Sequence, residues 1–456
     1  MRPAHAGARR AAAPEGAGAS ASYAASPSML IVCMSVFVAN IALPSIAADL
    51  GGGMVVRQWA ISGYTLPFAA LLIASGSVSD RIGAKRTLVS ASLAYGLVSA
   101  ACPFAPSMEA LVALQVALGS LGAFMLPSSM SLIDETYPGG PQKSKALMLW
   151  GIGGSSASAV GPLAGGALVQ VHWGLAFVVN VPFCIAIALL CANVPNRTVS
   201  QGGKPWDMAG LTLGTAGLAA LVGGIILLGD APSGAFAAFL LAFGCAVLAL
   251  FAWREKRFAH PVFPMGLFGK GGTRLALLAG FAMIFAWNGS VFACTLLLQG
   301  ELGFSPLESG FAFAPAALAC MLGNVVGEKL VNRKGITFPL VFGGAVLLAG
   351  YVALALGFCR QSFAAIALAM SLAGMGGAVV TPVLALMILT QSETGASGAA
   401  SAAFNAMRQV GGGTVGVAVY GMALSVAASP VGGFLGASLV SLLMLSAMVI
   451  SFARVR

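Results

Sequence analysis

The chain has 456 residues, of which 59% are hydrophobic and only 8% are charged. A soluble globular domain carries about 25% charged residues, so this composition excludes an ordinary water-soluble protein. The formal net charge of +10 could indicate nucleic-acid binding, but the basic residues lie in short loops between apolar runs, as membrane topology requires. We therefore expect the lipid bilayer as a partner and no nucleic acid.

The apolar runs recur from Met29 to the C-terminus, and at about 20 residues each can cross about 30 Å of hydrocarbon. They are uninterrupted rather than alternating with polar residues, which favours membrane-spanning helices over a β-barrel. None of the eight cysteines forms a CxxC pair, so neither a zinc site nor a disulfide framework is indicated. The pattern predicts an all-α membrane protein, without metal or cofactor.

Residues 1–27 are rich in Ala, Gly and Ser and lack the apolar core of a signal peptide, so we predict a disordered cytoplasmic N-terminal tail. After this tail, hydropathy predicts about fourteen transmembrane helices. Their expected ranges are 28–48, 59–79, 87–105, 109–132, 146–170, 174–194, 209–229, 234–253, 274–298, 308–327, 337–357, 363–388, 398–424 and 432–453.

The positions of the basic residues test this count. If both termini are cytoplasmic, twenty of the 23 Lys and Arg residues fall on the inner side. Arg57 and Arg360 fall on the outer side, and Arg408 falls within a span. Such a bias is typical of a multi-pass protein in the inner (plasma) membrane. One missed span would reverse every later loop and remove the bias, so the bias favours fourteen spans.

The chain divides around the two predicted helices at 209–253, which have six spans before them and six after. The loop sequence DRIG at 80–83 is echoed by NRKG at 332–335, after the second span of each group. This echo suggests a duplicated six-helix unit, as in transporters with parallel repeats. We expect an N-terminal six-helix bundle at 28–195, a linker with two extra transmembrane helices at 196–261 and a C-terminal six-helix bundle at 262–456.

The first of these loops reads GSVSDRIGAKR over residues 76–86. Its glycine permits close helix approach, its acid can accept hydrogen bonds from a helix N-terminus, and its terminal basic pair can face anionic lipid. An ordinary tight cytoplasmic turn explains the same residues, so both interpretations stay open. A gating role would involve Gly76, Asp80, Arg81, Gly83, Lys85 and Arg86.

The fifth predicted span contains GIGGSSASAVGPLAGG over residues 151–166. Small residues four apart form a ridge that allows very close helix packing, and the proline removes one backbone hydrogen bond beside it. A tight helix crossing is therefore expected, and a bendable element in a conformational cycle is the functional interpretation. The residues concerned are Gly161, Pro162, Gly165 and Gly166.

These segments, taken in order, resemble the major facilitator superfamily, and specifically its fourteen-span drug:proton antiporter branch. NIALPSIAADL at 40–50, WAISGYTL at 59–66 and the loop motif resemble the first half, and GASGAASAAFNAMRQVGGGTVGVAV at 395–419 resembles the second. Within the branch, GYTLPFAALL, LPSSMSL and HPVFPMGLF look closest to methylenomycin A resistance-type exporters. The resemblance implies two six-helix bundles that rock about a central cavity, driven by proton entry, in a monomeric exporter of small, largely apolar molecules.

The chain departs from the branch at two positions. The usual first-helix aspartate, five residues before the asparagine that matches Asn40, is Ser35, and the usual fourth-helix arginine is Gln115. Both family positions are associated with proton or cation handling, so the coupling mechanism stays open. Every acid falls at a span end, in a loop or in the tail. Asp134 lies nearest to a core helix and is the proton-carrier candidate, although a solvated helix-end acid explains it as well.

Polar and aromatic residues within the spans are candidates for lining a substrate cavity, although any one of them can equally join two helices. Arg408 is distinctive because a mid-bilayer charge is expected to face the bundle interior and to have a partner. It either braces neighbouring helices through their carbonyls or meets an anionic group of the substrate. The candidates are Asn40, Tyr64, Gln115, Trp287, Asn288, Asn405 and Arg408.

A membrane enzyme and a transporter-like protein without coupled transport are the two alternative classes. A membrane enzyme would need acids, bases or metal ligands within reach of a substrate. The chain has no HExxH motif and no histidine within a predicted span. A transporter-like membrane sensor or a non-coupled facilitator stays open, because Ser35 and Gln115 replace residues associated with coupling.

Overall fold

The structure is a computed structural model, and it is built from helices throughout the part of the chain that it describes. The described residues are 15–137, 140–195, 207–229, 234–258, 263, 265–391 and 397–454. The first helix group comprises α1 (Glu15–Leu50), α2 (Met54–Ile82), α3 (Ala84–Ala101), η1 (Cys102–Phe104), α4 (Met108–Thr136), α5 (Gly140–Val171), α6 (Leu175–Val178) and α7 (Asn180–Ala192).

A pair of helices, α8 (Met208–Leu227) and α9 (Gly234–Glu255), precedes the second group. The second helix group comprises η3 (Met265–Gly269), α10 (Gly271–Leu296), η4 (Leu297–Glu301), α11 (Pro306–Lys334), α12 (Thr337–Cys359), α13 (Phe363–Gln391), α14 (Ser397–Gln409), η5 (Val410–Gly416), α15 (Val417–Val426) and α16 (Pro430–Phe452). Two of these segments, η4 and η5, are π-helical turns.

Each predicted span coincides with helical structure, but twelve helices in the described part are both long and apolar enough to cross a membrane. The predicted spans 59–79 and 146–170 fall in α2 and α5, parts of which lie outside the described side chains, so these two helices are not counted among the twelve. Within the described side chains of α5, Val160–Val171 forms an apolar stretch. The chain is therefore a multi-pass helical protein, and the count of fourteen spans stays a prediction.

The first helix begins earlier than predicted, at Glu15, inside the expected disordered tail. Ala21 and Ala24 are fully buried, and the hydroxyl groups of Ser22 and Tyr137 lie 2.9 Å apart. Alanine favours helix, and its small side chain lets α1 pack against the end of α4. The expectation of disorder is wrong for residues 15–27, and residues 1–14 lie outside the described part.

The echoed loops have the same backbone feature. Gly83, between α2 and α3, has φ of 98°, and Gly335, between α11 and α12, has φ of 75°. Both values lie in the region that glycine adopts readily and that other residues rarely adopt. The sequence echo therefore corresponds to a repeated sharp turn at the same place in each helix group.

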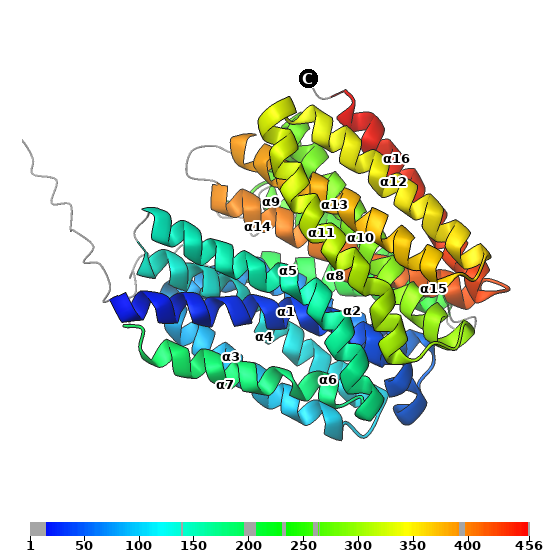
Figure 1. Cartoon of the computed structure of the whole chain (residues 1–456), viewed down its shortest axis with the longest axis horizontal. Helices are drawn as coiled ribbons and strands as arrows, with labels where there is room; N and C mark the ends of the chain where they lie inside the picture. Colours follow the sequence, from blue (N-terminus) through cyan, green and yellow to red (C-terminus); the bar gives the residue numbers. More distant parts are fainter. Residues whose placement is uncertain are drawn as a thin grey trace, which may run out of the picture.

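The two helix groups lie side by side, the first below the second in Figure 1. Within the first group α1 packs on α5 and α2 on α4, and within the second α13 packs on both α11 and α12. The groups meet where α5 contacts α11 and where α2 contacts α14, η5 and α15. We call the end of the molecule at which α2 and α11 begin the joined end, and the opposite end the split end.

The buried apolar side chains show why we call the two ends joined and split. The largest core cluster contains Ile41 and Tyr64 of the first group together with Phe292 and Val417 of the second. Towards the split end, the second group has its own core cluster, which includes Phe404, and the first group has a small one around Ile133. Among the described residues, the core is thus continuous across the groups at the joined end and separate at the split end.

The α8–α9 pair packs beside the joined end. Val222 and Ile226 of α8 are fully buried in a cluster with Leu66 of α2 and Ala418 of α15. In contrast, α9 exposes most of its apolar surface, including Phe239, which is 60% exposed. The pair therefore touches both helix groups through α8 and presents α9 outwards.

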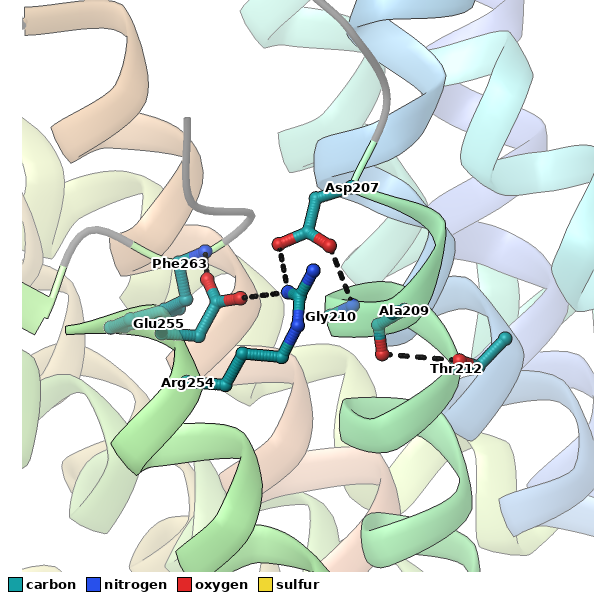
Figure 2. Close-up of polar contacts among 7 residues, drawn as sticks. All are labelled: Asp207, Ala209, Gly210, Thr212, Arg254, Glu255 and Phe263. Atoms are coloured by element: carbon teal, nitrogen blue, oxygen red, sulfur yellow. Dashed lines mark hydrogen bonds and ion pairs between the residues drawn. The ribbon is translucent and has the colours of Figure 1, made fainter. Parts of the chain in front are cut away.

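Polar contacts fix the other end of the pair (Figure 2). Asp207 caps α8 by accepting a hydrogen bond from the backbone N–H of Gly210 at 2.8 Å, and it binds the Arg254 guanidinium at 2.5 Å. Glu255 lies 3.7 Å from the same guanidinium and accepts from the backbone N–H of Phe263 at 2.7 Å. Burial opposes the charged form of Asp207, but the hydrogen bonds from Arg254 and Gly210 hold the pKa of its carboxyl below the usual value.

These contacts predict an order of stability. Asp207→Asn keeps an acceptor for the helix cap but loses the ion pair, whereas Asp207→Ala loses both. We expect the alanine variant to be less stable than the asparagine variant by about 1 kcal/mol, the usual contribution of a helix cap. Thermal unfolding of the purified protein would measure this difference.

Because the pKa of Asp207 is lowered on folding, the wild type should also lose the stabilisation from the Asp207 contacts as the pH falls through that pKa. Equal stability of both variants and the wild type would contradict the assignment.

Candidate functional site

The predicted tight helix crossing is confirmed in α5, and its partners lie on two sides. A Cβ atom at Gly161 would lie 3.0 Å from the Cβ of Phe37, and one at Gly165 would lie 3.2 Å from the Cα of Val38, both on α1. A Cβ atom at Gly166 would lie 2.7 Å from the carbonyl oxygen of Pro306, at the start of α11. The stretch 161–166 therefore joins α5 to its own group and to the other group.

The contact with α11 is reciprocal. Gly310 of α11 faces the carbonyl group of Pro162 so closely that any Cβ there would overlap it. Backbones can approach this closely only where both helices present small residues. Pro162 and Gly166 thus lie in an interface between the two helix groups at the joined end.

A second interface joins α2 to η5 and α15. The hydroxyl group of Thr65 donates to the carbonyl oxygen of Gly413 at 2.6 Å, and both residues are fully or almost fully buried. A Cβ at Gly413 would overlap Thr65, and a Cβ at Gly421 would overlap Gln58. We call the α5–α11 and α2–η5–α15 interfaces together the seam.

The side chain of Gln58 is an unsatisfied polar group in the seam. Both side-chain amide atoms of Gln58 are buried and have no hydrogen-bond partner among the described residues. A buried unsatisfied polar group costs about 1–3 kcal/mol. The seam is therefore stabilised by close packing and opposed by the desolvation of this amide.

In the GSVSDRIGAKR loop, Lys85 does not reach for lipid as expected. Its ammonium group donates to the carbonyl oxygens of Val194 at 2.5 Å and Ala192 at 3.2 Å, at the end of α7. Carbonyls at a helix C-terminus lack intrahelical partners and carry partial negative charge, which explains the attraction. Arg86, by contrast, is exposed.

The remaining loop candidates are placed less fully. Gly83 makes the turn, and Arg81 lies partly buried in the last turn of α2 with interactions of its own. Gly76 and Asp80 belong to α2, but the surroundings of their side chains lie outside the described part. A gating role for this loop stays a prediction.

Ser35, which stands where the resembled branch has an aspartate, belongs to a network of neutral groups. Its hydroxyl group lies 2.6 Å from that of Tyr95 on α3 and donates to the carbonyl oxygen of Ile31 at 2.9 Å. The side-chain amide of Asn180 on α7 lies 3.5 Å from Ser35 and 3.4 Å from Ser99. The position therefore faces the interior of the first helix group, and polar neighbours satisfy it without a charge.

Three cavity candidates of the first group are buried. The amide of Asn40 donates to the carbonyl oxygen of Val36 at 2.8 Å within α1, while its oxygen has no partner among the described residues. Tyr64 donates to the carbonyl oxygen of Val32 at 3.1 Å and so joins α2 to α1. Gln115 on α4 is only 3% exposed. Tyr64 thus has the helix-joining role that was the alternative to lining a cavity.

The candidates of the second group are more accessible. Trp287 and Asn288 on α10 and Arg408 on α14 are partly exposed, and Asn405 is exposed. Arg408 and Tyr64, which belong to different helix groups, each lie within electrostatic reach of Cys33 on α1.

Asp134 lies exposed at the end of α4, where its carboxylate pairs with the ammonium group of Lys143 at 2.9 Å. This placement is that of a solvated helix-end acid, and a proton-carrier role stays untested. A surface hollow of about 620 Å³ lies elsewhere, and no candidate residue lines it. Its lining residues are Glu255, Lys256, Phe258, Met265, Gly266, Phe268 and Gly269.

Sequence reasoning missed Cys33, Thr65, Gln58 and the Ser35 network. Each is a polar or sulfur-containing residue in an apolar span, which is the only signal that the sequence offers. Such a residue shows that a helix face seeks a polar partner, but not which helix supplies it, because the partners are tens to hundreds of positions away along the chain.

Three comparisons with known proteins are consistent with this architecture. The profile of a family described as the Major Facilitator Superfamily matches residues 25–416. The multidrug efflux pump LfrA of Mycolicibacterium smegmatis is 30% identical over 86% of this chain and 78% of its own length. The methylenomycin A resistance protein of Streptomyces coelicolor is 30% identical over 87% of this chain and 83% of its own length. The crystal structure of a D-xylose–proton symporter superposes with a TM-score of 0.69 at 12% identity, over 96% of each chain.

The seam predicts the effect of a single methyl group. Gly413→Ala places a Cβ against Thr65, and overpacking of this kind costs about 1–3 kcal/mol. We expect the joined end to open and transport per molecule of protein in proteoliposomes to fall roughly tenfold, which corresponds to about 1.4 kcal/mol. Gly436→Ala in α16 is the matched control, because a Cβ there meets nothing within 4 Å. Equal transport by both variants would contradict a functional seam.

Adjacent basic residues provide a second test. Lys85→Ala removes the donor at the end of α7, whereas Arg86→Ala removes an exposed charge. We expect Lys85→Ala to lower the melting temperature in detergent by several degrees and Arg86→Ala to leave it nearly unchanged. If the two variants have the same melting temperature, the contacts of Lys85 with the end of α7 do not stabilise the fold.

Proposed function

Because the chain belongs to the Major Facilitator Superfamily, we propose that it is a secondary active efflux pump that exports small, largely apolar drugs or secondary metabolites by alternating access. As a member of this family with efflux and resistance proteins among its relatives, it is a membrane transporter and not an enzyme. The relatives named for drug efflux and methylenomycin A resistance, each 30% identical, support export as the direction of transport.

The continuous core at one end and separate cores at the other carry this proposal. Two helix groups joined in this way can separate at the seam and meet at the split end. The small residues of the seam suit repeated association, because they add little side-chain entropy to each closure. In alternating access, the contacts of the seam then break while new contacts between the two helix groups form at the split end.

We further propose fourteen spans in the plasma (inner) membrane, with both termini cytoplasmic and the helix groups as two six-helix bundles. The distribution of Lys and Arg supports this orientation. Under it, the joined end is the outer end, and the structure is a state open towards the cytoplasm. Small-molecule substrates would enter between the helix groups from the inside.

Proton antiport is the coupling that the family resemblance favours. The neutral network around Ser35 contains no carboxylate, and Asp134 must leave Lys143 before it can carry a proton through the molecule. Because neither group is an evident proton carrier, proton coupling needs a test of its own, separate from the test of transport. A non-coupled facilitator would transport without a gradient, and a sensor would not transport at all.

Inverted membrane vesicles separate these functions. With an acidic interior, we expect a neutral lipophilic dye to accumulate inside, and a protonophore should abolish the accumulation. A divalent organic cation should be a poor substrate, because burying an unpaired charge is costly and the sequence places every acid at a span end, in a loop or in the tail. Vesicles without the protein provide the control. Equilibration of the dye regardless of the gradient would identify a facilitator, and no protein-dependent flux would exclude the proposed function.

A further inference from the structure

Arg408 is the one basic residue that the sequence places deep within a span, and in the structure it lies inside the continuous helix that α14, η5 and α15 form over residues 397–426. At 1.5 Å per residue this helix is about 45 Å long, which exceeds a hydrocarbon layer of about 30 Å. Arg408 lies about 16 Å from its first residue. A guanidinium group at this depth needs a partner or water, because leaving it desolvated is costly.

No protein group in the described part neutralises this charge. The described ion pairs involve only Lys143 and Arg254 as cations. The guanidinium group lies 5.5 Å from the centre of the Phe404 ring and near the thiol group of Cys33. No hydrogen bond joins Arg408 to a carbonyl group among the described residues, so the bracing role expected as the alternative has no support. The side chain is nevertheless partly exposed, so a ligand can reach it.

The position of Arg408 between the helix groups adds a second observation. It lies five residues before Gly413, which forms the seam, on the side towards the split end. Cys33 belongs to the first helix group and Phe404 to the separate core of the second. Arg408 therefore lies where the continuous core ends and the separation of the two groups begins.

Local structure holds it there. The π-helical segment Val410–Gly416 follows directly, and such segments widen a helix and often accompany functional sites. On α10, Gly280 leaves room for the stem of Arg408, since a Cβ there would lie 3.1 Å from its Cγ. Asn405 stands three residues earlier, on the same side of α14. The surroundings combine one cation with an aromatic ring, an amide and a thiol.

From this geometry we propose that Arg408 forms a subsite for an anionic group carried by an aromatic or apolar substrate, such as a carboxylate, sulfonate or phenolate. The anion would bind the guanidinium group, and the apolar body would lie against Phe404 and the ends of the two cores. The planar fork of arginine suits bidentate binding of such oxyanions. This inference rests on the proposed transport function and names the substrate chemistry that it favours.

A matched pair of fluorescent probes tests the subsite without any gradient. 8-Anilinonaphthalene-1-sulfonate carries the anion, and N-phenyl-1-naphthylamine has the same aromatic body without it. With purified protein in nanodiscs, we expect Arg408→Gln to weaken binding of the sulfonate roughly tenfold or more and to change binding of the neutral probe by less than about twofold. Arg408→Lys should weaken sulfonate binding by less than Arg408→Gln does. Arg360→Gln is the control, because it removes the same charge from an exposed position.

A second measurement uses the wild type alone, so it does not depend on the folding of a variant. Alkylation of Cys33 by N-ethylmaleimide, followed by mass spectrometry of its peptide, should be slowed by the sulfonate and less by the neutral probe. The proposed subsite would be contradicted if Arg408→Gln weakened the binding of both probes equally. It would also be contradicted if both probes protected Cys33 from alkylation equally. Failure of export in vesicles would overturn the proposed function instead, and it would leave these binding results unaffected.

Discussion

The arrangement of the molecule depends on how closely helix backbones can approach at the seam. Gly166 lies against Pro306, Gly310 against Pro162 and Gly413 against Thr65, and none of these places has room for a larger side chain. Lipid tails are as apolar as the side chains, so association here depends on close packing and hydrogen bonds rather than on the hydrophobic effect. The buried amide of Gln58 opposes the same contact. The seam is therefore a contact of moderate strength, as the proposed opening of the seam in each transport cycle requires.

Much of the helical architecture could be predicted from hydropathy, because a chain in lipid must satisfy its backbone within helices. The prediction failed at the start of α1, where Ala21 and Ala24 are buried despite the polar composition around them. It also missed the π-helical turns η4 and η5, because neither segment has a composition that distinguishes it from an α-helix. For α2 and α5, helix was predicted correctly, but parts of both lie outside the described side chains, so the twelve candidate spans do not test whether these two helices cross the membrane.

The candidate site was less predictable, because its properties arise from partners that the sequence does not pair. The glycines of α5 indicated close packing, yet nothing near them indicated that Gly166 would meet α11 while Gly165 met α1. Lys85 was expected at the lipid surface, but the carbonyl groups at the end of α7 bind it. Ser35 marked a missing charge, and only the structure shows Tyr95 and Asn180 beside it. For Arg408 the sequence left bracing and anion binding open, and anion binding is the role that we propose.

The separate cores at the split end have a consequence for how the chain is assembled. Almost every strong helix contact lies within one group, between α1 and α5 or α11 and α13, for example. Segments that pack locally can complete their cores as units, and domains generally fold in this way during synthesis. The first group can therefore be packed while the second is still being inserted, and the seam can form last. Quality control of newly made protein would then detect defects within a group and tolerate defects in the seam, so variation that alters transport without altering abundance should concentrate there.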